Sequence, residues 1–149
     1  MIRIVRTNSE NQDFINLVKE LDVYLKIVDG EDHDFYNQYN HIDVLQHAVV
    51  VYHNNIPVGC GAIKPFDASS MEVKRMYVKP NYRGRGIAQQ ITEELESWTK
   101  ESGYQSTILE TGKRQADAVC FYQKCKYQVI PNYGQYKGIT NSVCFKKEL

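Results

Sequence analysis

The sequence contains no long apolar segment. None of its 149 residues belongs to an apolar run of about 18 residues, the length that a membrane-spanning helix needs. The first residues, Met-Ile-Arg-Ile-Val-Arg, also lack the apolar stretch of a secretory signal peptide. We therefore expect neither export nor membrane attachment, and we expect the protein to act in the cytoplasm.

Metal-binding patterns and excess charge are absent too. The 4 cysteines have no paired zinc-type spacing, and the 4 histidines are scattered, so we expect free thiols and no bound metal. The 18 basic and 18 acidic side chains give a formal net charge of zero, and no basic helix is present, which argues against a nucleic-acid partner. The length and the 42% hydrophobic content suit one globular domain, residues 1–149.

The most informative segment runs from Glu72 to Ala88. Residues 72–78 carry β-branched and aromatic side chains, which favour a strand, and Pro80 ends it. A helix follows, because four apolar residues recur at helical spacing: Ile87, Ile91, Leu95 and Trp98. Gly84 and Gly86 therefore lie in a turn that leads into a helix N-terminus.

This turn predicts an anion site. The first N–H groups of a helix have no internal acceptor and attract anions. Five basic residues fall within twelve positions with no acid among them: Lys74, Arg75, Lys79, Arg83 and Arg85. Because guanidinium groups can fork onto phosphate oxygens, we interpret the turn as a diphosphate site.

The letters Arg83-Gly-Arg-Gly-Ile-Ala88 match the Arg/Gln-x-x-Gly-x-Gly/Ala signature of the GNAT superfamily of acyl-CoA-dependent N-acetyltransferases. Met-Tyr-Val precedes it at the expected interval, a Leu109–Thr111 strand follows, and a Phe121-Tyr122 pair lies in a further helix. The chain resembles a single-domain member, most closely over residues 45–130. The resemblance implies acetyl-CoA as cosubstrate and these cofactor-binding residues: Met76, Tyr77, Val78, Arg83, Gly84, Arg85, Gly86, Ile87, Ala88 and Gln115.

Two glutamates are candidate general bases. An alkylamine with a pKa of about 10.4 must lose a proton before it can attack a thioester. Glu72 stands four residues before Met76, where family members often carry a glutamate, and Glu110 ends the next strand, where other members place theirs. Each could instead be an ordinary solvated or salt-bridged carboxylate. In the family, a backbone N–H near Met76 stabilises the oxyanion. Alternation along the strand predicts one shared face for Glu72, Lys74, Met76 and Val78.

Tyr122 is the candidate general acid for the CoA thiolate. It lies in a segment that matches the family's Ala-x-x-x-Tyr-x-x-x-Gly-Phe/Tyr helix, and Gln115 falls where many members have an asparagine that contacts CoA. A core aromatic is the other interpretation of Tyr122. The sequence departs from the family at Lys126, where glycine usually adopts a left-handed helix cap. A lysine there costs about 1 kcal/mol or ends the helix differently.

The N-terminal third predicts a strand at Ile2–Arg6, followed by an amphipathic helix. Ser9 and Gln12 form a capping box at the start of this helix, and Gly30 ends it. Residues 10–34 hold eight acids and two lysines. This acidic segment is either a solvated face or a surface that steers a cationic amine toward an acceptor pocket. Phe35, Tyr36 and Tyr39 lie beside it in the sequence. A hairpin then turns at Asn54-Asn55. Gly59 and Gly61 in its second arm make room for either a ligand or a neighbouring element.

The tail predicts a turn-rich loop with Tyr133 and Tyr136, either exposed or lining the acceptor pocket, and a last strand at Ser142–Lys146. The whole order gives an α+β fold like that of the GNAT family: a mixed, mostly antiparallel sheet flanked by helices. This sheet opens a V between the strand at 72–78 and the strand that carries Glu110. By analogy with the family, a homodimer is an expectation.

Other functions fit less well. A dinucleotide-binding start would need a third glycine where Gln89 stands. The sequence is also compatible with a non-catalytic protein that binds acyl-CoA as a sensor. The acceptor, a small-molecule or peptide amine that we expect to be cationic, is not encoded in any motif.

Overall fold

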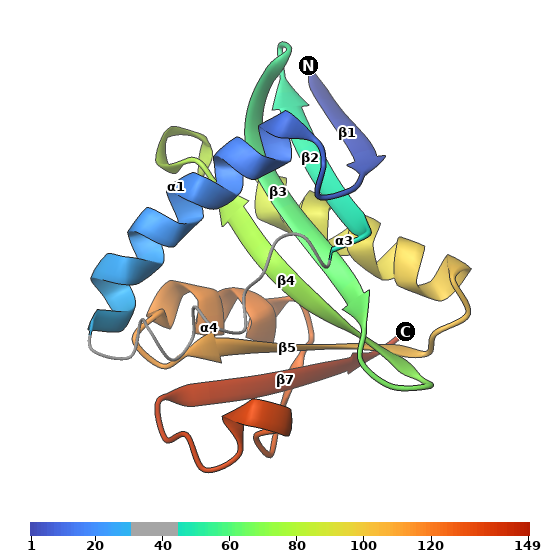
Figure 1. Cartoon of the computed structure of the whole chain (residues 1–149), viewed down its shortest axis with the longest axis vertical. Coiled ribbons are helices and arrows are strands. Elements are labelled where there is room, and N and C mark those ends of the chain that lie inside the picture. Colours follow the sequence, from blue (N-terminus) through green and yellow to red (C-terminus); the bar gives the residue numbers. More distant parts are fainter. Residues whose placement is uncertain (31–44) are drawn as a thin grey trace.

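The structure is a computed structural model that describes residues 1–30 and 45–149. Within these ranges the strands form one sheet in the order β1-β2-β3-β4-β5-β7-β6 (Figure 1). The strands are β1 (Ile2–Thr7), β2 (His47–His53), β3 (Ile56–Pro65), β4 (Ser70–Val78), β5 (Ser106–Gly112), β6 (Gln128–Ile130) and β7 (Ser142–Glu148). Only β4 and β5 pair in parallel in this part of the chain. The predicted α+β class is confirmed, and the antiparallel run from β1 to β4 does not match a dinucleotide-binding sheet.

Helices cover both faces of the sheet. Helix α1 (Gln12–Asp29) crosses β2, β3 and β4 on one face, and α3 (Ile87–Glu101) lies on the other (Figure 1). Strand β2 is buried on both faces: Val50 packs in the cluster under α1, and Val49 and Val51 pack in the cluster under α3. That second cluster also takes in residues of α4 (Ala116–Lys124). No described helix is long and apolar enough to cross a membrane.

The helix ends follow local chemistry. The predicted capping box at Ser9 and Gln12 is wrong, because the side chain of Asn11 accepts hydrogen bonds from the backbone N–H groups of Asp13 and Phe14 instead. Gly30 ends α1 with a φ of 55°, as the sequence predicts. The segment with Phe35, Tyr36 and Tyr39, which the sequence places beside an acceptor pocket, lies outside the described residues.

The two glycines of β3 allow α3 to pack closely against the sheet. A Cβ atom at Gly61 would lie 2.6 Å from the sulfur of Met76 and 2.8 Å from Cγ2 of Ile91. At Gly59 it would lie 3.1 Å from Cδ1 of Ile91 and 3.3 Å from Cγ2 of Ile87. Of the two interpretations of these glycines, the close approach of a neighbouring element is therefore the one that the structure supports.

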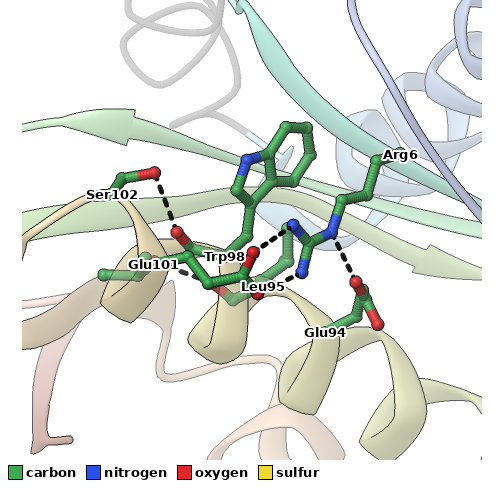
Figure 2. Close-up of polar contacts among 7 residues, drawn as sticks. Arg6, Glu94, Leu95, Trp98, Glu101 and Ser102 are labelled. Carbon is green, nitrogen blue, oxygen red and sulfur yellow. Dashed lines mark hydrogen bonds and ion pairs between the residues drawn. The ribbon is translucent and has the colours of Figure 1, made fainter.

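Strand β1 is fastened to α3 by one arginine. Figure 2 shows the Arg6 guanidinium between two carboxylates of α3: it donates to Glu94 and, at 2.9 and 2.7 Å, to both oxygens of Glu101. Its Cζ also lies 5.0 Å from the centre of the Trp98 ring. A planar guanidinium suits this arrangement because it can fork onto a carboxylate and stack on a ring together. These contacts join the edge strand to the helix that follows the glycine turn.

Candidate active site

A cleft opens where β4 and β5 separate. Their parallel pairing covers only three residue pairs, from Ser70 with Ser106 to Glu72 with Ile108. Beyond these pairs the two strands enclose a cleft of about 140 Å³. Residues 72–76 line one wall, residues 109–112 line the other, and α4 contributes Tyr122. The V that the sequence predicts therefore exists.

A β-bulge in β4 changes which side chains share a face. Ala62 of β3 pairs with Lys74, and Cys60 pairs with Tyr77, so Arg75 and Met76 both lie opposite Gly61. Arg75 has a φ of 59°, in the left-handed region. The same alternation puts Val73 and Tyr77 together on the other face, and this is wrong across the bulge: Val73 packs with the α3 cluster, but Tyr77 packs with the α1 cluster.

Glu72 is buried in the cleft, with a relative exposure of 3%. The hydroxyl of Tyr133 donates to its Oε2 at 2.6 Å, and Nζ of Lys74 lies 3.8 Å from its Oε1. Burial lowers the pKa of Lys74, against the opposing effect of the nearby Glu72 carboxylate. Of the two alternatives to a general base, a solvated carboxylate does not hold because Glu72 is buried, but a salt-bridged carboxylate fits the contact with Lys74.

Glu110 lies on the facing wall of the same cleft. Strand β5 continues past it to Gly112, so the expectation that Glu110 ends its strand is wrong by two residues. It is less buried than Glu72 and pairs in register with Cys144 of β7. Both candidate bases thus reach one cleft from the two diverging strands.

Tyr122 also lines the cleft, although its side chain belongs to the core. Its ring packs edge-on against Phe121 and Tyr127, with centroids 5.1 and 5.6 Å apart. Burial raises the pKa of its hydroxyl above the ordinary value of 10.0. The group therefore keeps its proton throughout the neutral range, but the raised pKa also makes it a weaker acid toward a thiolate than a solvated tyrosine. Gln115, at the N-cap of α4, lines the cleft as well.

The glycine turn ends at the N-terminus of α3, as predicted. Gly84 and Gly86 have φ values of 78° and 79°, and a Cβ at either position would meet no atom within 4 Å. Their glycine identity therefore serves the backbone conformation and not packing. No side chain in the described part of the chain caps this helix end. Ile87 turns its side chain into the core, so its backbone N–H is the group that can face a ligand.

Only two of the five basic residues in this region remain at the turn. Arg75 donates to Asp22 of α1 at 2.8 Å, and Lys79 lies 3.6 Å from Glu20 of α1. Lys74 lies in the cleft beside Glu72. The sequence suggests a diphosphate for the basic residues and a cationic amine for the acids of α1. In the structure, two of these basic residues pair with two of these acids instead.

Arg83 and Arg85 lie on aromatic rings at the turn. Nε of Arg83 donates to the Val78 carbonyl at 2.8 Å, and its Cζ lies 5.7 Å from the ring centre of Tyr77. Arg85 lies over the ring of Tyr82, at 5.1 Å. Tyr77 itself points toward α1, where its hydroxyl donates to Glu20 at 3.2 Å. Met76 faces α3, next to Gly61, and lines the cleft.

Sequence reasoning placed Lys74 on the same face of the strand as Glu72, and the structure brings the two side chains together. It missed the second partner of Glu72. The contact with Tyr133 crosses 61 sequence positions and has no local signal. The described residues contain no cluster of three or more side chains that could hold a metal ion.

Comparison with known proteins extends these observations. The sequence model of the acetyltransferase (GNAT) domain family matches residues 45–129. An IAA acetyltransferase of Azospirillum brasilense is 30% identical, and the match covers 99% of this chain and 98% of that protein.

Two solved structures have the same fold. One, from Klebsiella pneumoniae, is assigned as an acyl-CoA N-acyltransferase; it has a TM-score of 0.84 at 25% identity and matches 100% of this chain and 98% of its own. The other is the PaiA N-acetyltransferase of Thermoplasma acidophilum in complex with coenzyme A. It has a TM-score of 0.74 at 18% identity, with 100% and 99% covered. The diverging strands, the glycine turn at α3 and the family match agree, and the chain belongs to the GNAT family of N-acetyltransferases.

Proposed function

We propose that the protein transfers the acetyl group of acetyl-CoA to a primary amine by direct attack in the β4–β5 cleft. The observation that carries this proposal is the convergence of Glu72, Glu110 and Tyr122 on one cleft, at the point where the two parallel strands separate. The family match supports the acetyl donor, and the coenzyme A in the Thermoplasma structure supports CoA as its carrier.

The cofactor would bind along β4 and the turn. Past Glu72, no strand of the described residues pairs with the edge of β4 that faces β5, so the backbone groups of Met76, Tyr77 and Val78 are candidates to hydrogen-bond the pantetheine arm. The N–H groups from Gly84 to Ala88, with Arg83 and Arg85, would take the diphosphate. Gln115 would contact the cofactor from the start of α4.

Catalysis would use one base and one acid. The cationic amine first loses a proton through a water molecule to Glu72, with Glu110 as the alternative acceptor, and the neutral nitrogen then attacks the thioester carbon. A backbone N–H near Met76 stabilises the oxyanion. The C–S bond then breaks, the CoA thiolate takes a proton from Tyr122, and the second proton of the nitrogen returns to Tyr122 as the amide forms. We favour Glu72 because its carboxylate is fixed by two partners in the structure.

The acceptor would be a small-molecule or peptide amine that arrives as a cation. Glu110 of the cleft supports this choice. Glu72 and three acids of α1 do not, because Glu72 lies beside Lys74, and Asp13, Glu20 and Asp22 are engaged with Tyr52, Lys79 and Arg75. The name of the Azospirillum relative makes IAA a second acceptor to test. The free thiols suit a reducing compartment, so we propose action in the cytoplasm. A homodimer is part of the proposal by analogy only.

Turnover tests the proposal. CoA release from acetyl-CoA is measured with a panel of primary amines and with IAA, for the wild type and for Glu72→Gln. We expect release with at least one amine, and a loss of kcat on the order of a hundredfold in Glu72→Gln, because the amide cannot accept the proton. Glu110→Gln is the matched variant on the facing wall. No release above background with any acceptor would count against the proposed activity, and an unchanged Glu72→Gln rate would shift the base to Glu110.

A further inference from the structure

Tyr133 contacts the candidate base from the opposite end of the chain. It lies just before the 3-10 turn η4 (Gly134–Tyr136), on the segment that links β6 to β7. Its hydroxyl donates to Oε2 of Glu72 at 2.6 Å. Burial and the nearby carboxylate both raise the pKa of Tyr133 above its ordinary value, so the hydroxyl remains a donor throughout the neutral range.

The tyrosine ring is itself held in place. It packs edge-on against Phe66, with ring centroids 4.9 Å apart, and against Tyr136 at 5.8 Å. The backbone N–H of Tyr136 donates to the Tyr133 carbonyl at 2.9 Å. The amide of Asn132 donates to the carbonyls of Tyr136 and Ile139, at 3.1 and 2.9 Å. The hydroxyl is thus presented to Glu72 by a segment with its own internal bonds.

We propose that Tyr133 is a positioning residue for acetyl transfer, which holds the Glu72 carboxylate in the orientation that accepts the amine proton. This inference rests on the proposed function of Glu72 as the base. With Oε2 fixed by Tyr133, Oε1 is the oxygen left to meet a water molecule in the cleft, beside Lys74 at 3.8 Å. A general base acts efficiently only when its oxygen is held within hydrogen-bond reach of the proton that it takes.

Several titratable or charged groups lie around Glu72 on the elements around the cleft. They are Lys64 of β3, Lys74 and Arg75 of β4, Glu110 of β5, Cys144 of β7 and Tyr136 of η4. Burial raises the pKa of Cys144 to about 11, and the pKa of Tyr136 is raised as well, so neither loses a proton near neutrality. Loss of a proton from Lys74 would affect the basic limb of a pH–rate profile. The acid limb therefore reports a carboxylate.

The test compares wild type, Tyr133→Phe, Glu72→Gln and the double variant. The control is Tyr104→Phe, at a tyrosine between α3 and β5 that does not line the cleft. Phenylalanine keeps the ring that packs on Phe66 and removes only the donor. We expect Tyr133→Phe to lower kcat on the order of tenfold with little change in KM. We also expect its acid limb to move to higher pH, because a hydrogen bond favours the ionised form of a carboxylate. In the Glu72→Gln background, Tyr133→Phe should add less than about a twofold loss.

An unchanged pH profile in Tyr133→Phe, with Glu72→Gln strongly impaired, would overturn the positioning role and leave the proposed function intact. A full tenfold loss in the Glu72→Gln background would overturn it as well, because Tyr133 would then act independently of Glu72. If Glu72→Gln kept the wild-type rate, or if no acceptor were acetylated, the proposed base or the proposed activity would fail and the positioning role with it. Urea unfolding of the same five proteins shows whether each one folds.

Discussion

Lys126 occupies a position where the family usually has glycine, and it adopts the conformation that glycine would. Its φ is 72°, and helix α4 ends with two bonds, from the N–H of Lys126 to the Gln123 carbonyl and from the N–H of Tyr127 to the Tyr122 carbonyl. These bonds form a Schellman motif, with Tyr127 packed on Tyr122. The helix end is therefore regular, and the lysine bears the strain of a left-handed residue.

Lys126→Gly should stabilise the protein by about 1 kcal/mol, because glycine adopts positive φ without a Cβ clash. The matched control is Lys124→Gly, which removes the same charge from the last helical residue and should destabilise by about 0.5–1 kcal/mol. Urea unfolding gives both values. Equal effects of the two substitutions would mean that the backbone at residue 126 is not strained.

At the scale of the single element, the sequence predicted where strands and helices lie better than it predicted which side chains share a face. The hairpin, the glycine turn and the helix from Ile87 follow from periodicity and turn residues, and all three are confirmed. The bulge at Arg75 could not be predicted, because the residue in the left-handed conformation is an arginine and not a glycine. The contacts that hold Arg75 there come from across the sheet and from α1: Cys60 donates to the Arg75 carbonyl, and Asp22 accepts from the guanidinium.

The contribution of the contact between Arg6 of β1 and the carboxylates of α3 to stability can be tested by substitution of Arg6. Arg6 holds the carboxylate pKa of Glu101 below its ordinary value of 4.5. The stability that this ion pair contributes is complete at pH values above 4.5 and is lost as the pH falls through the lowered pKa of Glu101. Arg6→Ala should lower the melting temperature by a few degrees at pH 7 and low salt, and by less in high salt.

Arg6→Lys, which keeps the charge but not the fork, should recover only part of the loss. Melting curves at pH 7 and below pH 4 provide the check. A difference between wild type and Arg6→Ala that stayed the same size at both pH values would show that the ion pairs do not contribute.

At the scale of the whole molecule, the cleft is assembled from distant parts of the chain. Glu72 comes from β4, Glu110 from β5, Tyr122 from α4 and Tyr133 from the segment before β7. The first three could be named from the sequence because the family signature orders them. The contacts of Tyr133 with Glu72 and of Arg75 with Asp22 could not be predicted, because they join segments that only the folded sheet brings together.

Donor binding tests the central claim most directly. Melting of the protein is followed with acetyl-CoA, with CoA and with NADP in parallel. A ligand that binds only the folded state at a hundredfold excess over Kd stabilises it by about 2.7 kcal/mol. We expect acetyl-CoA and CoA to raise the melting temperature and NADP to leave it unchanged. A shift with NADP and none with acetyl-CoA would contradict the assignment of the turn from Arg83 to Ala88, and the roles of Glu72 and Tyr122 would fall with it.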